Sequence, residues 1–392
     1  MGQCLAPANQ TGGGGSNGSS GKKENNWTHV PNSPLSPTEI ISRIRKEDGE
    51  FMIGNRVLSY GVICFRGYYP DTPYKANQDE YKVVTPSQWQ ANRALFSVYD
   101  GHGHVGEKCA RFAQQLLPKE AMNAERNGAF SSGDGAAVGA LTHVFVDVNK
   151  KMHAATDIDD TLSGTTAVMG MVLGEDIWVS NVGDSRAIVG LKNGAGGIDV
   201  KPLSTDQTPY RRDERARVRK SGARVLNMDQ LEGLEAIHDD WDMALGDEVD
   251  EAGDPPRIWS QDGAYPGTAF TRSFGDSIAE ELGVFAEPET LKHTMGPSDQ
   301  LMVVASDGIW EFLTNSEVMA IVTAADDPQD AACQLWKAAY KEWITKEVRT
   351  DDITVIVVDL NGFYSSGGGG GGGGGVSRGG GTKKDTRRGS LK

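Results

Sequence analysis

Four aspartates in this 392-residue chain each stand beside a run of apolar residues typical of a β-strand. In three of the four cases a glycine is the immediate neighbour, which permits a sharp turn at the strand end. Carboxylates placed in this way can reach a shared point, and Mg²⁺ and Mn²⁺ prefer such oxygen ligands. An Asp-Gly pair is also an ordinary turn, so one instance alone says little. Four instances, with His102 inside one of the turns, predict a carboxylate-rich metal centre formed by Asp100, Asp184, Asp307 and Asp351.

Seven short segments carry these aspartates and their neighbours. In chain order they are Lys75–Asp79, Asp100–Gly103, Ser163–Ala167, Gly183–Arg186, Gly267–Asp276, Ser306–Trp310 and Arg349–Val355. Their order and spacing over residues 50–362 resemble the metal-dependent type 2C protein serine/threonine phosphatases, the PPM family. Arg66–Pro70 and Tyr265–Phe270 resemble a plant and protist branch of that family. The resemblance implies a phosphoprotein phosphatase that acts on phosphoserine and phosphothreonine with Mg²⁺ or Mn²⁺ as cofactor.

The resemblance also implies roles for individual residues. Two Mg²⁺ or Mn²⁺ ions about 3.5 to 4 Å apart would activate a water for in-line attack on the phosphorus atom. Asp100 would bridge both ions, and the carbonyl oxygen of Gly101 would bind one of them. Asp307 and Asp351 would bind the other ion. Asp351, rather than Asp352, matches the family's aspartate because Ile-Thr-Val begins two residues after it.

Three further acidic positions belong to the implied site. Asp184 and Asp276 match acidic positions near the ions, and Asp184 is a candidate ligand for a weaker third ion. Many members of the family carry Glu-Asp where this chain has Gln78-Asp79. A neutral amide therefore replaces one anionic outer ligand. We expect Asp79 to contribute more of the metal binding at that position, and the affinity there to be lower.

His102 matches the family's proposed general acid. An imidazole can protonate the leaving serine or threonine oxygen at neutral pH, although a histidine that only fills the turn is an alternative. The cation for the substrate phosphate is ambiguous, because the family's arginine falls where this chain has Tyr74 and Lys75. We expect Arg66 to bind the phosphate, because a guanidinium can donate two parallel hydrogen bonds to it and a lysine cannot.

Two other classes of function deserve comparison. A catalytically weak family member could act as a phosphoprotein-binding scaffold, since a fold does not imply an activity. The complete aspartate set argues against this scaffold. A calcium sensor formed by the acidic run 239–254 is excluded by spacing, because no Asp-x-Asp-x-Asp-Gly loop occurs there.

Runs rich in branched and aromatic residues are expected to form the strands that position these side chains. Several runs are almost continuously apolar, so both of their faces should be covered. Amphipathic stretches at 106–117, at 136–155 and after Pro328 predict the covering helices, with Trp310, Trp336 and Trp343 in the core. We therefore expect an α+β fold, a four-layer αββα sandwich of two antiparallel sheets flanked by helices, which the resemblance also implies. The expected strands are 56–65, 94–99, 165–173, 176–182, 186–191, 300–306 and 353–360.

Composition agrees with an enzyme of ordinary size. The hydrophobic content is 38%, and no stretch reaches the length of a membrane span. The four cysteines have no metal or disulfide spacing, which suits a reducing compartment, and we expect a monomeric cytoplasmic protein. The net charge of −15 makes nucleic acid an unsuitable partner. Residues 229–262 hold twelve carboxylates and one arginine, which predicts a solvated loop.

Both ends of the chain differ from the middle. Residues 1–36 and 363–392 are rich in small and polar residues, so we expect disordered tails around a catalytic domain at 50–362. Gly2 and Cys4 are candidates for myristoylation and palmitoylation, and two acyl chains would anchor the protein to a membrane. Ala6 departs from the myristoylation pattern, which prefers serine or threonine there. The basic C-terminal tail contains Ser390 in a sequence that resembles a kinase site.

Overall fold

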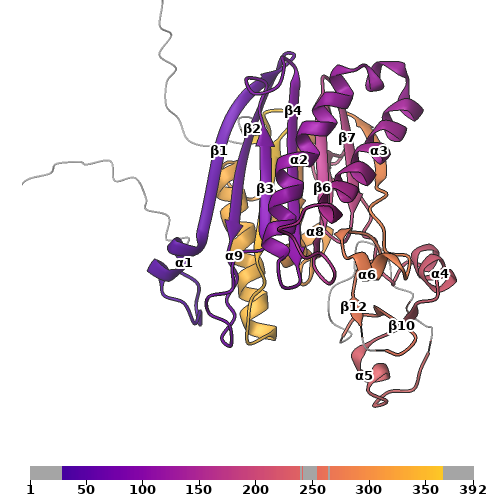
Figure 1. The fold of residues 1–392 in the computed structure, drawn as a ribbon. Coiled ribbons are helices and arrows are strands. Elements are labelled where there is room, and N and C mark those ends of the chain that lie inside the picture. The colour runs from indigo at the N-terminus through magenta and orange to yellow at the C-terminus, as the bar shows by residue number, and fades with distance from the viewer. Residues whose placement is uncertain (1–28, 239–240, 242–253, 264, 365–392) are drawn as a thin grey trace, which may run out of the picture.

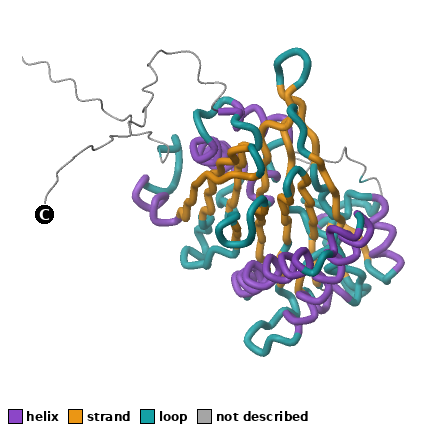
Figure 2. Tube along the Cα trace, turned by 90° about the horizontal axis from the view of Figure 1, so that it is seen from above, coloured by secondary structure: helices purple, strands orange, loops and turns teal. Residues whose placement is uncertain are grey.

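Two antiparallel β-sheets lie face to face between two layers of helices (Figure 1). The computed structural model describes residues 29–238, 241, 254–263 and 265–364. Seen from above, the strands occupy the middle of the molecule and helices lie on either side of them (Figure 2). This is the expected four-layer αββα sandwich, and the α+β prediction is confirmed.

The first sheet pairs strands from both ends of the chain. Its neighbours are all antiparallel, so β16 and β15, which come late in the sequence, complete a sheet begun by β1 and β2. The order across this sheet is β1 (Ile44–Ile53), β2 (Arg56–Phe65), β16 (Ile353–Asp359), β15 (Asp299–Ala305), β8 (Arg186–Lys192) and β9 (Ile198–Pro202).

The second sheet is formed by the middle of the chain. Its β3 (Asp79–Val84) pairs with β4 beside the main path of the sheet. Along that path the order is β13 (Phe274–Gly275), β5 (Gly164–Thr165), β4 (Arg93–His102), β6 (Ala167–Leu173), β7 (Asp176–Val182) and β14 (Glu289–Thr294).

Helices cover the outer face of each sheet. The helix α9 (Pro328–Lys346) packs on β2 and β16, and α8 (Asn315–Thr323) and the short α7 (Asp307–Trp310) lie beside it. Local sequence explains where α9 begins, because Asp327 accepts a hydrogen bond from the backbone N–H of Asp330 (2.8 Å) and a proline follows at the first helical position. The second sheet is covered by α2 (Gly106–Arg126) and α3 (Asp134–His153), which are joined through the 3-10 turn η1 (Ala129–Ser132).

A small third sheet lies beside the ends of the large ones. It pairs β10 (Arg224–Leu226), β11 (Arg257–Trp259) and β12 (Pro266–Thr268), and α4 (Arg212–Lys220), α5 (Met228–Leu231) and α6 (Ser277–Glu280) adjoin it. Ile258 and Trp259 are buried there. The described part of the acidic segment 229–262 is therefore partly a packed strand rather than only a solvated loop, and residues 239–240 and 242–253 lie outside the described residues.

Apolar side chains fill the spaces between the layers. The cluster between the sheets includes Val62, Phe96 and Met302, each fully buried. The three tryptophans expected in the core, Trp310, Trp336 and Trp343, are all buried in one cluster under α9. Within it, Trp336 packs on Phe65. Burying one such side chain contributes about 1.5 to 3 kcal/mol, so these layers hold the strand ends in fixed positions.

The ends of the ordered region differ from those expected. Residues 29–36 were grouped with the N-terminal tail by composition, but Val30 and Leu35 are buried against the cluster under α9. A hydrogen bond between Ser33 and Tyr340 (2.8 Å) joins this segment to α9. Two isolated apolar residues carry no periodic signal, which is why composition placed them in the tail. At the other end, the same cluster contacts Phe363 and Tyr364.

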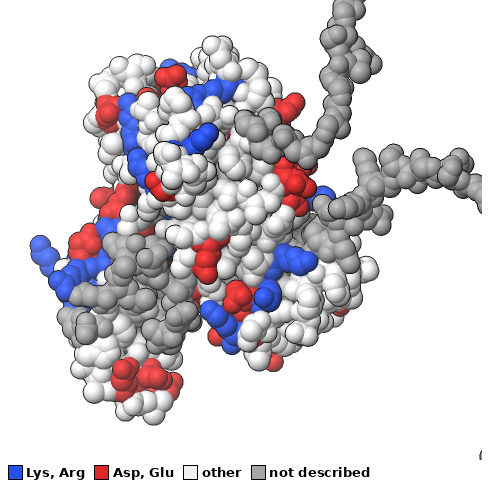
Figure 3. Space-filling view, turned by 180° about the vertical axis from the view of Figure 1, so that it is seen from behind, with Lys and Arg blue, Asp and Glu red and all other residues white. Residues whose placement is uncertain are grey.

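Strand β1 was not expected, because its sequence mixes charged and apolar residues. It is an edge strand, and charged side chains are typical of sheet edges that face solvent. The helix α1 (Pro37–Arg43) leads into it, so regular structure begins before residue 50. Among the described residues, no helix is long and apolar enough to cross a membrane. Acidic and basic side chains are interspersed on the face seen from behind (Figure 3).

Candidate active site

Strand ends from both sheets bring the predicted aspartates to one place. In the second sheet, Asp79 and Asp100 stand opposite each other in the register of β3 and β4. In the first sheet, Asp307 follows β15 and begins α7, whereas Asp351 precedes β16, the strand that pairs with β15. Asp184 lies in the turn between β7 and β8, the turn that connects the two sheets. Antiparallel pairing therefore places turns and strand ends of both sheets at the same edge.

A cavity of about 630 Å³ opens over this edge. Its floor carries carboxylates, and its walls come from two directions: the end of α9 on one side and the loop around β11 and β12 on the other. Asp79 is fully buried below it. The site residues that line the cavity are His102, Asp184, Asp276, Asp307 and Asp351.

The aspartates repel one another. Burial, the charge of Asp307 and the charge of Asp79 raise the pKa of Asp100 well above its usual range. Burial and the neighbouring Asp351 raise the pKa of Asp307 to about 6. Burial, Asp307 and the nearby Asp206 likewise raise the pKa of Asp184. Like charges held this close favour protonation unless a cation shares the site, so this group of carboxylates fits a divalent cation.

Asp79 gives a second indication of a cation site. Its Oδ1 atom is buried and has no hydrogen-bond partner among the described residues, whereas its Oδ2 atom accepts a hydrogen bond from Ser306 Oγ (2.8 Å). Burial and the neighbouring Asp352 raise the pKa of Asp79. A buried carboxylate oxygen without a partner is costly, and a bound cation or its water would satisfy it.

Asp351 and Asp352 have different surroundings. Asp351 lines the cavity, and the hydroxyl of Tyr69 donates a hydrogen bond to it. Asp352 is 2% exposed and accepts hydrogen bonds from the backbone N–H groups of Gly67 and Gln78, both at 2.7 Å. Asp351 is thus the carboxylate available to a ligand, and Asp352 binds backbone.

Gln78 and Gly101 shape the turn that carries His102. The side-chain amide of Gln78 donates a hydrogen bond to the carbonyl oxygen of Gly103 (2.8 Å). At Gly101 a Cβ atom would lie 2.3 Å from the carbonyl oxygen of Gly106. Only glycine fits at this position, so the turn can pack closely against the start of α2.

His102 is held by a buried carboxylate. Its Nε2 atom lies 2.7 Å from Oδ2 of Asp276, and its ring packs on Phe270 at 4.5 Å between centroids. Asp276 is 2% exposed, has a positive φ of 52° and also accepts a hydrogen bond from Ser273 Oγ (2.6 Å). Asp276 therefore orients His102, a role that its match to an acidic position near the metals did not suggest.

The structure does not bring Arg66 into the cavity. Its backbone carbonyl accepts a hydrogen bond from Arg43, and the arginines that line the cavity, among the described residues, are Arg257 and Arg349. Arg349 lies 3.6 Å from Asp351. Lys75 is also close, since its positive charge acts to lower the pKa of Asp307. Arg349 was not predicted because it lies beside Asp351 rather than upstream of the acidic pair.

Glu311 also lines the cavity and was not predicted. It follows Asp307 by four residues across the short helix α7, and residues at that spacing lie on one face of a helix. The i, i+4 spacing of two carboxylates in Asp307-Gly-Ile-Trp-Glu311 was the signal available in the sequence. Together with Asp184, Glu311 forms a second acidic wall of the cavity.

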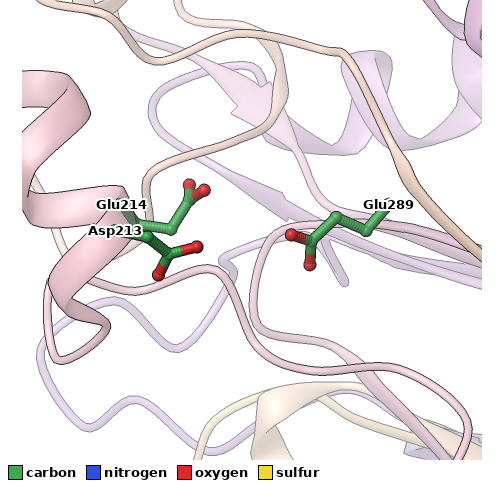
Figure 4. A group of neighbouring side chains, drawn as sticks. All are labelled: Asp213, Glu214 and Glu289. Atoms are coloured by element: carbon green, nitrogen blue, oxygen red, sulfur yellow. The ribbon is translucent and has the colours of Figure 1, made fainter.

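A different acidic group lies outside this cavity. Asp213 and Glu214, at the start of α4, point toward Glu289 on β14 (Figure 4), and their oxygens are close enough to hold an ion. Arginines already occupy this space. Arg211 donates hydrogen bonds to both oxygens of Glu289 (2.7 and 2.8 Å) and to Asp213 (2.7 Å), and Arg272 donates one to Glu214 (2.7 Å).

The pKa values of these three carboxylates agree with arginine neutralisation. Burial would raise the pKa of Glu289, but hydrogen bonds from Arg211 lower it below its usual range. Burial would likewise raise the pKa of Glu214, but its hydrogen bond with Arg272 lowers it, and the pKa lies below its usual range. This group is a structural ion-pair network that fastens α4 to β14, not a metal centre.

Comparison with known proteins supports the same class of protein as the geometry of the site. A layered sandwich with clustered, partly buried aspartates at its strand ends and a carboxylate-held histidine beside them has the features of a metal-dependent hydrolase. The chain matches the sequence model of the family described as "Protein phosphatase 2C" over residues 77–348. That range contains all the site residues predicted from the sequence except Arg66 and Asp351, and it ends one residue before Arg349.

Individual relatives agree. The chain is 44% identical over 301 residues to "Probable protein phosphatase 2C 35" of Arabidopsis thaliana, covering 77% of this chain and 83% of that protein. It is 30% identical over 368 residues to "Probable protein phosphatase 2C 64" of Oryza sativa subsp. japonica, covering 92% and 78% respectively. The fold resembles the crystal structure of a serine-threonine phosphatase 2C from Toxoplasma gondii, with a TM-score of 0.62 and 16% identity, covering 81% of this chain and 99% of that chain. The chain belongs to the protein phosphatase 2C family.

A histidine behind the site gives a pH-dependent prediction. His153 lies between Glu280 (3.2 Å) and Asp160 (2.6 Å), and these partners, Glu280 foremost, raise its pKa to about 9. The protonated form therefore stabilises the fold fully below about pH 6.5, the unfolded value, and this contribution is lost as pH rises through 9.

We expect His153→Gln to lower the free energy of unfolding by about 1 to 2 kcal/mol at pH 6, since the site is partly exposed and solvent screens the pair. The deficit should shrink toward pH 9.5. Urea unfolding of both proteins at pH 6, 7.5 and 9.5 measures it. A deficit of equal size at all three pH values would show that lost packing, not lost charge, causes it.

Proposed function

We propose that the chain hydrolyses phosphoserine and phosphothreonine esters in proteins, with His102 as general acid and a water as nucleophile. The observation that carries the proposal is the set of partly buried, mutually repelling aspartates around the fully buried Asp79, which has an orphaned oxygen. Two bound Mg²⁺ or Mn²⁺ ions would supply a water of lowered pKa and neutralise phosphoryl oxygens. Asp79, Asp100, Gly101, Asp307 and Asp351 are the residues that would hold them.

The remaining site residues have roles in positioning and proton transfer. Asp276 fixes the ring of His102, which faces the cavity and can donate a proton to the departing serine or threonine oxygen. Asp184 and Glu311 are the candidates for a weaker third ion. For the substrate phosphate, the cavity favours Arg349 over Arg66, because Arg349 lines the cavity and its charge lies beside Asp351. The charge of Lys75 also acts on Asp307.

A scaffold without activity is the alternative. Such a protein has no need to keep several repelling carboxylates, because each costs stability when no cation is bound. The supporting residues argue in the same direction. Ser306 donates a hydrogen bond to Asp79, and Asp352 accepts one from the backbone N–H of the neighbouring Gln78. Asp276 fixes His102, a residue that a scaffold would not use.

The first prediction concerns metal binding. Asp307→Asn removes one charge from the cluster, so we expect weaker binding of Mn²⁺ by at least tenfold in titration calorimetry and a loss of turnover by several orders of magnitude. The matched control is Asp213→Asn, which makes the same chemical change in the arginine-paired group and should leave Mn²⁺ binding as it was. Equal Mn²⁺ affinity in wild type and Asp307→Asn would end the assignment of the metal centre.

The second prediction concerns His102. We expect His102→Gln to reduce turnover strongly on a phosphothreonine peptide, whose leaving alkoxide needs a proton, and much less on an aryl phosphate, whose phenolate departs without one. The comparison uses initial rates on both substrates at saturating Mn²⁺. Similar losses on the two substrates would remove His102 from the acid role.

The third prediction concerns location, and Gly2 and Cys4 lie outside the described residues. We propose that both are acylated and anchor the protein to the cytoplasmic face of a membrane. One myristoyl chain alone gives an association constant of only about 10⁴ M⁻¹, so both groups are needed for firm attachment. In cell fractionation we expect the wild type in the membrane pellet and both Gly2→Ala and Cys4→Ser mostly in the soluble fraction. The same distribution for all three proteins would refute the anchor.

A further inference from the structure

A second cavity, of about 640 Å³, lies between the β1–β2 hairpin and the start of α9. We call it the acidic groove. It shares no lining residue with the cavity over the aspartates. Its described lining contains no lysine or arginine. It contains five carboxylates, Asp48, Glu50, Asp326, Asp327 and Asp359.

Three of these carboxylates have no cation beside them. Asp48, Glu50 and Asp326 are exposed, and among the described residues none forms an ion pair with a lysine or arginine. Asp327 and Asp359 accept hydrogen bonds from backbone N–H groups, which leaves their negative charge in place. The groove therefore has a concentrated negative charge, with no cation among its described lining residues.

The described part of the chain ends beside this groove, at Tyr364. Tyr364, the last described residue, is part of its lining and donates a hydrogen bond to the carbonyl oxygen of Val322 (2.8 Å). Burial and the negative charge of Asp359 raise the pKa of Tyr364. The 28 residues that follow contain an unbroken run of nine glycines and then a basic segment, in which Arg378, Lys383, Lys384, Arg387, Arg388 and Lys392 face a single acidic residue, Asp385.

Chain length favours an encounter between the two. Arg378 is 14 residues beyond Tyr364, and a glycine-rich linker of that length has a root-mean-square span of about 20 Å. A short flexible linker gives an effective concentration in the millimolar range. At such an effective concentration, individually weak ion pairs are sufficient for docking, because each of several basic residues can pair with the carboxylates of the groove.

We propose that the basic segment 378–392 docks in the acidic groove of the same chain. Charge complementarity and the position of Tyr364 carry the proposal. The proposal does not depend on the phosphatase activity.

Zero-length carbodiimide cross-linking of the full chain tests it, because this reagent joins a lysine to a carboxylate only when the two are in contact. We expect Lys383, Lys384 and Lys392 to be joined to peptides that contain Asp48, Glu50 or Asp326. The yield should fall at least tenfold in 1 M NaCl, where the Debye length is about 3 Å. A mixture of ¹⁴N- and ¹⁵N-labelled protein separates links within one chain from links between chains.

Two variants and one control sharpen the result. Asp48→Asn/Glu50→Gln/Asp326→Asn should lower the yield of these tail links at least fivefold. Arg387→Gln/Arg388→Gln, which leaves the reporter lysines and the folded domain unchanged, should lower it at least twofold. The control Asp157→Asn/Glu281→Gln/Glu287→Gln removes three exposed carboxylates outside the groove and should leave the yield as in wild type.

Three results would overturn the proposal. One is tail links that go mainly to the acidic segment 229–262, and another is links found only between isotopically different chains. The third is a yield that the groove variant and the control lower equally. If the groove variant fails to fold, the arginine variant decides alone, and an unchanged yield in it refutes the docking.

Discussion

Repulsion among clustered aspartates is the constraint that organises this molecule. Asp307 raises the pKa of Asp79 and of Asp100, Asp351 raises the pKa of Asp307, and among the described residues none of Asp79, Asp100 and Asp307 has an ion pair with a lysine or arginine. An arrangement of this kind survives only when the surrounding fold fixes the strand ends and a cation compensates the charge. The two sheets, each covered by helices and packed on the other, supply the first condition. Because the second condition requires a cation, the fold and the proposed metal site depend on each other.

Hydrogen bonds show how closely the sheets are joined at this edge. Asp352, in front of β16, accepts hydrogen bonds from Gly67, after β2, and from Gln78, before β3 of the other sheet. Ser306, at the end of β15, donates to Asp79 and accepts from the backbone N–H of Thr354. These residues do not line the cavity, but they set the separation of the carboxylates that do. A change in either sheet would therefore reach the clustered aspartates through short, buried connections.

The sequence predicted the parts of this arrangement that depend on local pattern. Runs of branched apolar residues located β2, β7 and β16 to within a residue, since strands buried on both faces are nearly continuous in apolar character. Strand β1 escaped prediction because residues 45–50 of this edge strand are five charged residues and a glycine, with no apolar side chain. The positions of Asp351 and Asp352 differ by one residue, and family spacing chose the one that faces the cavity. Arg349 could not be recognised, because only tertiary packing near the end of α9 brings it to the cavity, whereas for Glu311 the i, i+4 spacing from Asp307 was a local signal that went unused.

Gln78 shows how a departure from a family pattern can have a physical reason. The resemblance placed an anionic outer ligand here, but the amide of Gln78 donates a hydrogen bond to the carbonyl oxygen of Gly103. A carboxylate would put two acceptor oxygens against each other at this contact and add another negative charge to a group that already repels itself. The neutral amide instead fastens the turn between Gly101 and Gly103, and that turn carries His102. In this chain Gln78 thus supplies no charge near the proposed metal site, but it helps to fix the orientation of the proposed acid, His102.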